Sequence, residues 1–174
     1  MNSCNIERLD ATTGRAAVPE LAEILVDCVD GGASVSFMAP LSLERAAAFW
    51  HGVVDGVARG ERTLLLARDG KGAAIGTVQL ILAQPENQPH RADVAKLLVH
   101  RRARRSGAGE LLMREIERLA FVAGKTVLVL DTASADAERL YQRLGWTVCG
   151  VIPNYALNPD GSFCDTTVYW KALS

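Results

Sequence analysis

Apolar residues recur at the spacing of an amphipathic helix in two stretches near the start of the chain. The first stretch, residues 17–32, ends in two glycines that favour a helix stop. The second, residues 41–60, opens with Ser42 as an N-cap and also ends at a glycine. The short mixed segment before them, residues 4–10, is predicted to be an edge strand, and residues 33–40 are predicted to connect the two helices.

Strand patterns follow these helices. Residues 62–70 end in an Asp-Gly turn and residues 73–84 are a second apolar run, so the two are predicted to form a hairpin. A loop with two prolines covers residues 84–90, and residues 92–99 are the third strand of this run. Between residues 107 and 123 the apolar positions return to helical spacing.

The C-terminal part of the chain continues the alternation. Residues 126–133 are a continuous apolar run rich in β-branched residues, which is typical of a buried central strand. Residues 136–146 predict a short helix, and residues 147–155 and 166–173 predict two strands joined by a turn-rich segment. The order β-α-α-β-β-β-α-β-α-β-β predicts a mixed α/β fold, in a single domain that spans residues 1–174.

Composition and charge narrow the class of protein. Apolar residues make up 49% of the chain and charged residues 22%, which is a globular composition, and the net charge is −1. A nucleic-acid-binding domain usually has a basic excess, so nucleic acid is not an expected partner. The four cysteines lie far apart without a C-x-x-C pair, so we expect reduced thiols, a cytoplasmic location and no metal site. No signal peptide and no membrane-spanning run are expected.

The stretch "HRRARRSGAGELLM", residues 100–113, carries the first candidate chemistry. A strand, a turn with Gly107 and Gly109, and then a helix can hold phosphate, because the first amides of a helix have no internal partner and suit an anion. The alternative is a tight turn with solvated arginines, and the stretch alone leaves both interpretations open. It matches neither a Walker loop nor a G-x-G-x-x-G fingerprint.

Two motifs, in this order and separation, resemble the GNAT superfamily of acyl-CoA-dependent acetyltransferases. Residues 104–109 fit [RQ]-x-x-G-x-[GA] directly after an apolar strand, and "AERLYQRLGW", residues 137–146, is similar to A-x-x-[LF]-Y-x-x-x-G-[FW]. The resemblance covers the whole chain, including the two helices between the first and second strands. The segments "GGASVSFMAPL" and "NPDGSF" further resemble the tabtoxin-resistance acetyltransferase group. The implied fold is a mixed, mostly antiparallel sheet of about seven strands with a splayed parallel pair, flanked by four helices.

The resemblance implies acetyl-CoA as cosubstrate and gives its binding residues. The pantetheine arm would lie along the backbone of Leu97, Leu98 and Val99. The pyrophosphate would be held by loop amides, which belong to Arg104, Arg105, Ser106, Gly107, Ala108, Gly109 and Glu110. Arg101 stands where the family often has proline, and Ser134 stands where it often has an asparagine that contacts the coenzyme.

The resemblance also implies catalytic roles. Tyr141 matches a tyrosine beside the coenzyme sulfur that would protonate the leaving thiolate as a general acid; the alternative is a buried aromatic that only packs. A general base is needed to free the amine of its proton. Asp131, at the end of the buried strand, is preferred over Asp93, and His90 and His100 rank below both.

The acceptor site is predicted from the connector, the loop at residues 84–91 and the region of Tyr155. Its candidate lining residues are Phe37, Met38, Gln79, Asp93 and Tyr155, with Trp50 as a further one. The alternative for Phe37, Met38 and Trp50 is core packing. Carboxylates suit a cationic amino group, so the acceptor is predicted to be a small amino-acid-like molecule, including toxins or antibiotics of that kind.

The predicted activity is acetyl transfer from acetyl-CoA to an amino or hydroxyl group by direct attack in a ternary complex, with no covalent enzyme intermediate. Three alternatives stay open: a non-catalytic acyl-CoA sensor, a protein N-acetyltransferase and, ranked last, a nucleic-acid-binding module. A homodimer is a habit of the family that no sequence feature here demonstrates. A role in antibiotic or toxin resistance would follow from the subgroup.

Overall fold

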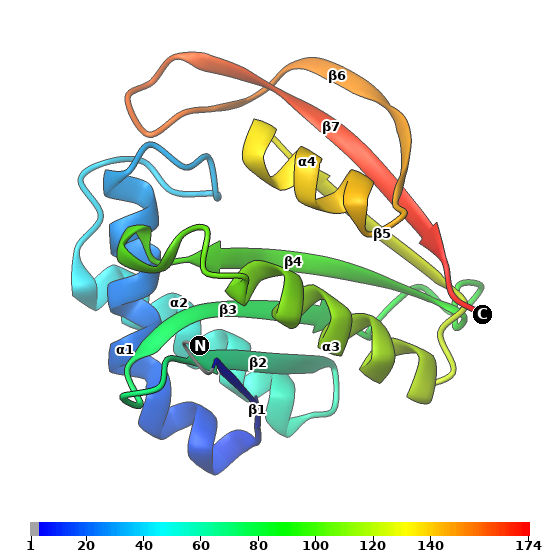
Figure 1. Cartoon of the computed structure of the whole chain (residues 1–174), viewed down its shortest axis with the longest axis horizontal. Coiled ribbons are helices and arrows are strands. Elements are labelled where there is room, and N and C mark those ends of the chain that lie inside the picture. Colours follow the sequence, from blue (N-terminus) through cyan, green and yellow to red (C-terminus); the bar gives the residue numbers. More distant parts are fainter. Residues whose placement is uncertain (1–3) are drawn as a thin grey trace.

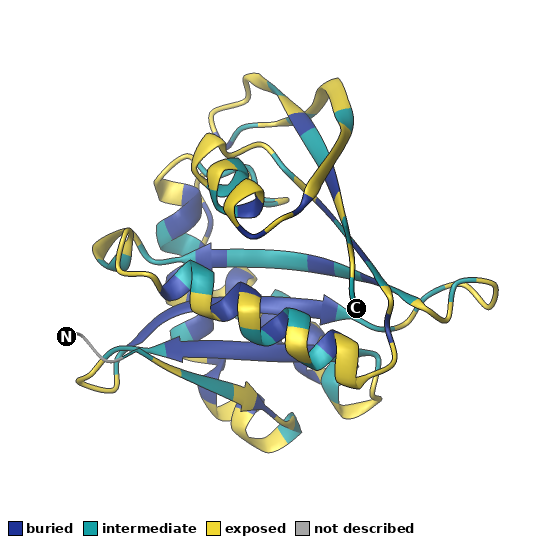
Figure 2. Cartoon of the chain, turned by 45° about the vertical axis from the view of Figure 1, so that its right-hand side comes forward, coloured by how far each residue is buried: buried dark blue, intermediate teal, exposed yellow. Residues whose placement is uncertain are grey.

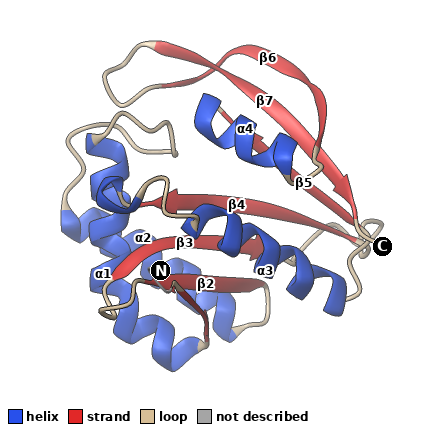
Figure 3. Cartoon of the chain, in the orientation of Figure 1, coloured by secondary structure: helices blue, strands red, loops and turns tan. Residues whose placement is uncertain are grey.

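The computed structural model describes residues 4–174, and these residues contain one seven-stranded sheet (Figures 1 and 3). The strands are β1 (Asn5–Leu9), β2 (Arg62–Arg68), β3 (Ala74–Ile81), β4 (Arg91–Val99), β5 (Val127–Thr132), β6 (Thr147–Leu157) and β7 (Phe163–Ala172). The helices are α1 (Ala11–Asp30), α2 (Leu43–Ala58), α3 (Ala108–Val122) and α4 (Ala135–Arg143), with a short 3₁₀ helix, η1 (Arg101–Ala103), between β4 and α3.

The strands lie in the order β1-β2-β3-β4-β5-β7-β6. Every neighbouring pair is antiparallel except β4 and β5, which are parallel and adjacent in the middle of the sheet. A parallel neighbour requires a crossover, and α3 supplies it between β4 and β5. This confirms the predicted mixed fold with four helices and one parallel pair.

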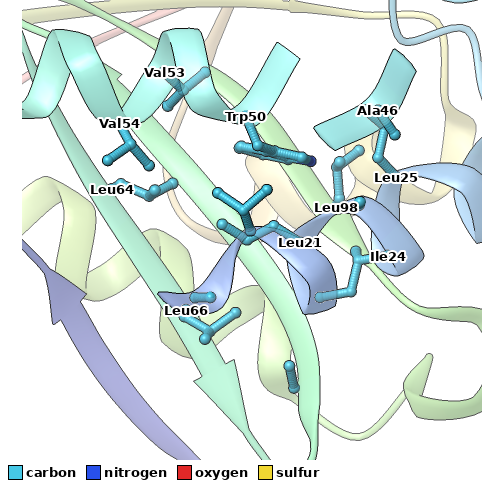
Figure 4. Packing of buried hydrophobic residues seen from close by; sticks show 14 of the residues in the cluster. Leu21, Ile24, Leu25, Ala46, Trp50, Val53, Val54, Leu64, Leu66 and Leu98 are labelled. Carbon is cyan, nitrogen blue, oxygen red and sulfur yellow. The ribbon is translucent and has the colours of Figure 1, made fainter. Parts of the chain in front are cut away.

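The sheet separates two apolar cores, and Figure 2 shows that β2 and β3 are buried along most of their length whereas β6 is exposed. On one face, α1 and α2 pack on β2 through residues such as Leu21, Val54 and Leu64, as Figure 4 shows. On the other face, α3 and the end of α4 pack on strands β2 to β5. Trp50 is fully buried in the first core, so the packing alternative for this residue is correct.

The first helix begins six residues before the predicted start, at Ala11 instead of residue 17. Asp10 caps it: its carboxylate accepts hydrogen bonds from the amides of Thr12 and Thr13 at 2.8 and 2.7 Å, and the Thr13 hydroxyl accepts one from the Asp10 amide at 2.9 Å. This reciprocal capping stabilises a polar first turn that the apolar pattern did not reveal.

The other boundaries differ less. Ser42 caps α2 as predicted, with its hydroxyl 3.2 Å from the Arg45 amide. The final hairpin is longer than predicted, since β6 extends to Leu157 and β7 begins at Phe163. Main-chain pairing such as Leu157 with Phe163 defines these ends, and pairing needs no buried side chain. Within residues 4–174 no helix has both the length and the apolar character needed to cross a bilayer.

Candidate active site

The parallel strands β4 and β5 pair for only three residues and then separate (Figure 3). The pairing runs from Arg91 with Val127 to Asp93 with Val129, although β4 continues to Val99. Main-chain groups alternate sides along a strand, so part of the backbone beyond Asp93 faces the side where the pairing with β5 has ended. The predicted coenzyme residues Leu97, Leu98 and Val99 lie in this part of β4.

A β-bulge lies in the same part of β4. Ala95 pairs with Gln79 and Leu98 pairs with Thr77 on β3, so two residues of β4, including Lys96, oppose one of β3. Lys96 has a positive φ of 53°. The bulge reverses the alternation of side chains, because Val94 packs in the core under α3 whereas Leu98 packs in the core under α1 and α2.

The loop after β4 ends at the N-terminus of α3. Gly107 is the N-cap residue with φ of 87° and has no side chain to bond the free amides of the first turn. The Ser106 hydroxyl is 3.4 Å from the Ala108 amide. Arg105 also has a positive φ, of 63°. Two left-handed residues so close together turn the chain sharply, and the helix N-terminus they leave is suited to an anion.

The four arginines of this segment divide into two pairs. The Arg101 amide and guanidinium donate to the Asp27 carboxylate at 2.8 and 3.0 Å, and Arg102 donates to the Ala74 carbonyl at 2.8 Å. These two arginines therefore tie the loop to α1 and β3. Burial opposes ionisation of Asp27, but the hydrogen bonds from Arg101 hold the pKa of this carboxyl below its ordinary value. Arg104 and Arg105 are exposed and form no ion pair within residues 4–174.

Tyr141 lies on α4 and is only 5% exposed. Its ring packs against Trp146 and Tyr169, with centroid distances of 5.9 and 5.6 Å. Burial, and after it the negative charge of Asp131, raises the pKa of the Tyr141 hydroxyl above its ordinary value. The hydroxyl therefore keeps its proton at neutral pH, as a general acid must.

The two candidate bases differ in their surroundings. Asp131 is exposed at the end of β5, two residues beyond the last β4–β5 pair, and accepts a hydrogen bond from the Thr166 hydroxyl at 2.7 Å. Asp93 lies in the last pair itself, where it forms an ion pair with Arg91 and accepts from the Gln84 amide at 3.1 Å. The Asp131 carboxylate is thus engaged by the Thr166 hydroxyl, whereas the Asp93 carboxylate is engaged by both Arg91 and Gln84. His100 is occupied structurally, because its Nδ1 accepts from the Arg102 amide at 3.2 Å.

Ser134 is engaged within its own helix. Its hydroxyl caps α4 by accepting from the Ala137 amide at 3.3 Å, and its amide donates to Thr132 Oγ1 at 3.1 Å. A coenzyme contact by Ser134 stays a prediction, and it would have to share the hydroxyl with this cap.

The α1–α2 connector crosses to the β6–β7 hairpin (Figure 1). The Ser34 hydroxyl donates to the Leu157 carbonyl at 2.9 Å, and the Ala39 amide donates to the Pro159 carbonyl at 3.2 Å. The second of these bonds joins residues 31–41 directly to residues 158–163, and the first joins residues 31–41 to the residue just before that segment.

The predicted acceptor residues do not all reach a surface. Met38 and Tyr155 are 40% and 57% exposed. Phe37 is half-buried, with its ring edge-on to Phe49 at a centroid distance of 5.3 Å. Gln79 is fully buried, and its Oε1 accepts from the Arg62 guanidinium at 2.8 Å. Gln79 therefore lies beneath the surface, and the prediction that it lines the acceptor site is wrong for this structure.

Lys96 is the residue that the sequence analysis missed. Its ammonium donates to the Ser36 hydroxyl at 2.9 Å and lies 5.8 Å from the centre of the Phe49 ring. The sequence signal was a lysine among apolar residues of a strand, but the bulge that directs it toward the α1–α2 connector leaves no recognisable pattern.

Comparison with known proteins agrees with this geometry. Residues 21–146 match the family model described as "Acetyltransferase (GNAT) family", which is well over half of the chain. The chain therefore belongs to the GNAT acetyltransferase family.

Several solved structures share the fold. An N-acetyltransferase from Staphylococcus aureus Mu50 has a TM-score of 0.81 at 15% identity, with 99% of each chain covered. A ribosomal-protein-alanine N-acetyltransferase from Brucella melitensis has a TM-score of 0.82 at 22% identity, with 97% of this chain and 99% of that chain covered. A phosphinothricin acetyltransferase from Sinorhizobium meliloti, in complex with acetyl-CoA, has a TM-score of 0.80 at 18% identity, with 98% and 89% covered.

Proposed function

We propose that this chain transfers an acetyl group from acetyl-CoA to the amino or hydroxyl group of a small amino-acid-like acceptor. The observation that carries the proposal is the separation of β4 and β5 beyond Asp93, with the N-terminus of α3 following one strand and Asp131 ending the other. An extended thioester ligand fits such an arrangement, because unpaired strand backbone can bind its amides and a helix N-terminus can bind its phosphates.

The coenzyme-binding residues proposed from the structure are mostly backbone groups. Leu97, Leu98 and Val99 would bind the pantetheine arm. The amides between Arg104 and Glu110 would hold the pyrophosphate, with Arg104 and Arg105 available for charge because they are exposed and form no ion pair within residues 4–174. Arg101 and Arg102 would act indirectly, by fixing the loop.

The proposed reaction has three proton transfers. Asp131 accepts a proton from the ammonium group of the acceptor, and the neutral amine attacks the thioester carbonyl. The bond from carbon to sulfur then breaks, and the Tyr141 hydroxyl donates its proton to the leaving thiolate. The acetylated nitrogen loses its remaining extra proton, which restores the Tyr141 hydroxyl, and Asp131 releases its proton to solvent. The products are an acetylated acceptor and coenzyme A with a free thiol. Asp93 is the second candidate base, and its ion pair with Arg91 would first have to loosen.

The finer features of the acceptor rest on the contact between two segments. Residues 31–41 and 158–163 resemble the tabtoxin-resistance acetyltransferases in sequence, and the hydrogen bond from the Ala39 amide to the Pro159 carbonyl joins these segments in the structure. We therefore infer that they form one wall of the acceptor site, with Phe37, Met38 and Tyr155 nearby. A role in detoxifying amino-acid-like toxins or antibiotics would follow from this subgroup.

Three further proposals concern the whole protein. Cys4, Cys28, Cys149 and Cys164 are free thiols, which is typical of a reducing compartment, and we propose a cytoplasmic location. Strands from both ends of the described chain, β1 and β7, join the same sheet, which supports the single domain predicted for residues 1–174. The homodimer stays a prediction that sedimentation can measure.

Two measurements test the proposed activity. Acetyl-CoA at about 100 times its Kd should stabilise the fold by about 2.7 kcal/mol and raise the melting temperature. No shift at saturating coenzyme would contradict both an enzyme and a sensor. Release of the coenzyme thiol should then occur with at least one acceptor from a panel of amino acids, amines and aminoglycosides; binding without release would favour the sensor.

A further inference from the structure

Lys96 occupies a position that strict strand alternation would not give it. Residues 94, 96 and 98 of a regular strand share one face, and Val94 packs in the apolar core under α3. The bulge instead turns Lys96 toward the α1–α2 connector, at a φ of 53° that a lysine rarely adopts. The bulge thus places the Lys96 side chain next to Ser36, in the part of β4 beyond the last pair with β5.

Lys96 is a half-buried residue, and its ammonium group has no carboxylate partner among residues 4–174. Its hydrogen-bond acceptor is the neutral Ser36 hydroxyl at 2.9 Å, and no ion pair joins Lys96 to an acidic residue of the described chain. Burial lowers the pKa of Lys96, while the charge of Asp131 raises it and that of Arg62 lowers it further. A cation in such surroundings is stabilised by an anion from outside the chain.

Gln79 and Arg62 lie in the wall behind Lys96. Gln79 pairs with Ala95, the residue before Lys96, and its Oε1 accepts from Arg62. This orientation leaves the buried Gln79 Nε2 without an acceptor among residues 4–174. Neither Arg62 nor Lys96 forms an ion pair within residues 4–174, so Lys96 has a charge that a ligand carboxylate can balance.

An amino acid in its reactive form matches this balance, because it has a neutral amine and a negative carboxylate. We propose that Lys96 binds the carboxylate of the acceptor and so determines specificity for amino acids over simple amines. The carboxylate would lie between Lys96 and the Ser36 hydroxyl, and the amine would lie toward Asp131. This inference rests on the proposed acetyltransferase activity and adds the residue that recognises the carboxylate of the acceptor.

The test compares acids with their amides. Thiol release is measured with L-amino acids and phosphinothricin and with the matching primary carboxamides, in the wild type, Lys96→Met and Lys96→Arg. We expect the wild type to prefer the acid by roughly 10-fold or more in kcat/KM, and Lys96→Met to raise the KM of the acid about 10-fold. The KM of acetyl-CoA and the kinetics with carboxamides should change little, and Lys96→Arg should retain the preference.

Lys71→Met is the matched control, since Lys71 is an exposed lysine in the β2–β3 turn. Equal use of acid and amide by the wild type, or an equal loss for both in Lys96→Met, would overturn the inference. If no acceptor releases thiol, the proposed activity fails instead. In that case the melting temperature of the chain loaded with coenzyme A is measured with the same acids. A rise in melting temperature that is lost in Lys96→Met supports carboxylate binding by Lys96, and no rise with any acid overturns it.

Discussion

At the scale of single residues, the candidate site depends on groups whose surroundings differ from those of a surface side chain. Tyr141 is enclosed by two aromatic rings, and Asp131 is exposed nearby. Burial of the phenol and the charge of the carboxylate both favour the protonated tyrosine. A proton donor and a proton acceptor can therefore coexist at neutral pH.

Replacing Tyr141 with phenylalanine tests its role as general acid. The ring contacts with Trp146 and Tyr169 remain, so folding and coenzyme binding should be preserved, while turnover should fall roughly 10²-fold or more. Thiol-release kinetics and acetyl-CoA affinity measure the two effects. Unchanged turnover would remove Tyr141 from the mechanism.

The pH profile provides a second test of the same hydroxyl. Because its pKa is raised, Tyr141 stays protonated up to and beyond about pH 10, so its ionisation should cause no fall in kcat below that pH. The assignment would be contradicted if kcat of the wild type fell as the pH rose just above neutral and this fall disappeared in Tyr141→Phe.

At the scale of elements, the junction between β4 and α3 is held by its arginines and shaped by its left-handed residues. Arg101 and Arg102 fasten it to α1 and β3, and Gly107 gives the N-cap a conformation that other residues rarely adopt. The N-cap itself has no side chain, so the long bond from the Ala108 amide to the Ser106 hydroxyl, at 3.4 Å, is the side-chain contact of this first turn. The binding of pyrophosphate would depend on this backbone geometry.

The variant Gly107→Val tests the junction. A β-branched residue at a φ of 87° is strained, so the loop should shift and the affinity for acetyl-CoA should fall by about 10-fold or more. Gly72→Val is a matched control, because Gly72 has a φ of 85° and equally open surroundings in the β2–β3 turn. Both variants should lose similar stability, but only Gly107→Val should weaken acetyl-CoA binding in a titration.

At the scale of the whole molecule, the sheet consists of two parts joined by a short parallel contact. Strands β1 to β4 form one part and β5 to β7 form the other. The α1–α2 connector, which lies near the first part, forms a hydrogen bond with the β6–β7 hairpin of the second part (Figure 1). The proposed ternary complex would place acetyl-CoA and the acceptor where these two parts of the sheet separate, and direct transfer remains the prediction to test.

Steady-state kinetics test direct transfer. Double-reciprocal plots at several acetyl-CoA concentrations should intersect, as for a ternary complex, whereas parallel lines would indicate an acetyl-enzyme. Replacing Cys149 and Cys164 with alanine should leave turnover largely unchanged, since neither thiol is needed as an acyl carrier. A mass increase of the chain by one acetyl group, lost in these variants, would contradict the proposal.

The sequence by itself determined the order of elements and the family, and it supplied phosphate binding at the β4–α3 junction as a hypothesis. Each of these depends on neighbouring residues: apolar spacing predicts helices and strands, and the motifs at residues 104–109 and 137–146 are contiguous. The start of α1 at Ala11 was not predicted, because the first turn of this helix is polar and apolar spacing does not reveal it. The capping residue Asp10 was nevertheless present in the sequence.

The tertiary structure alone decided what depends on contacts between distant segments. Pairing across strands decided where β4 and β5 separate and where the bulge turns Lys96 toward Ser36, sixty residues away. The tertiary structure also buries Gln79 completely, although the sequence predicted that this residue lines the acceptor site. The side on which a strand residue lies depends on its register with the neighbouring strand, and a bulge changes that register without a mark in the local sequence.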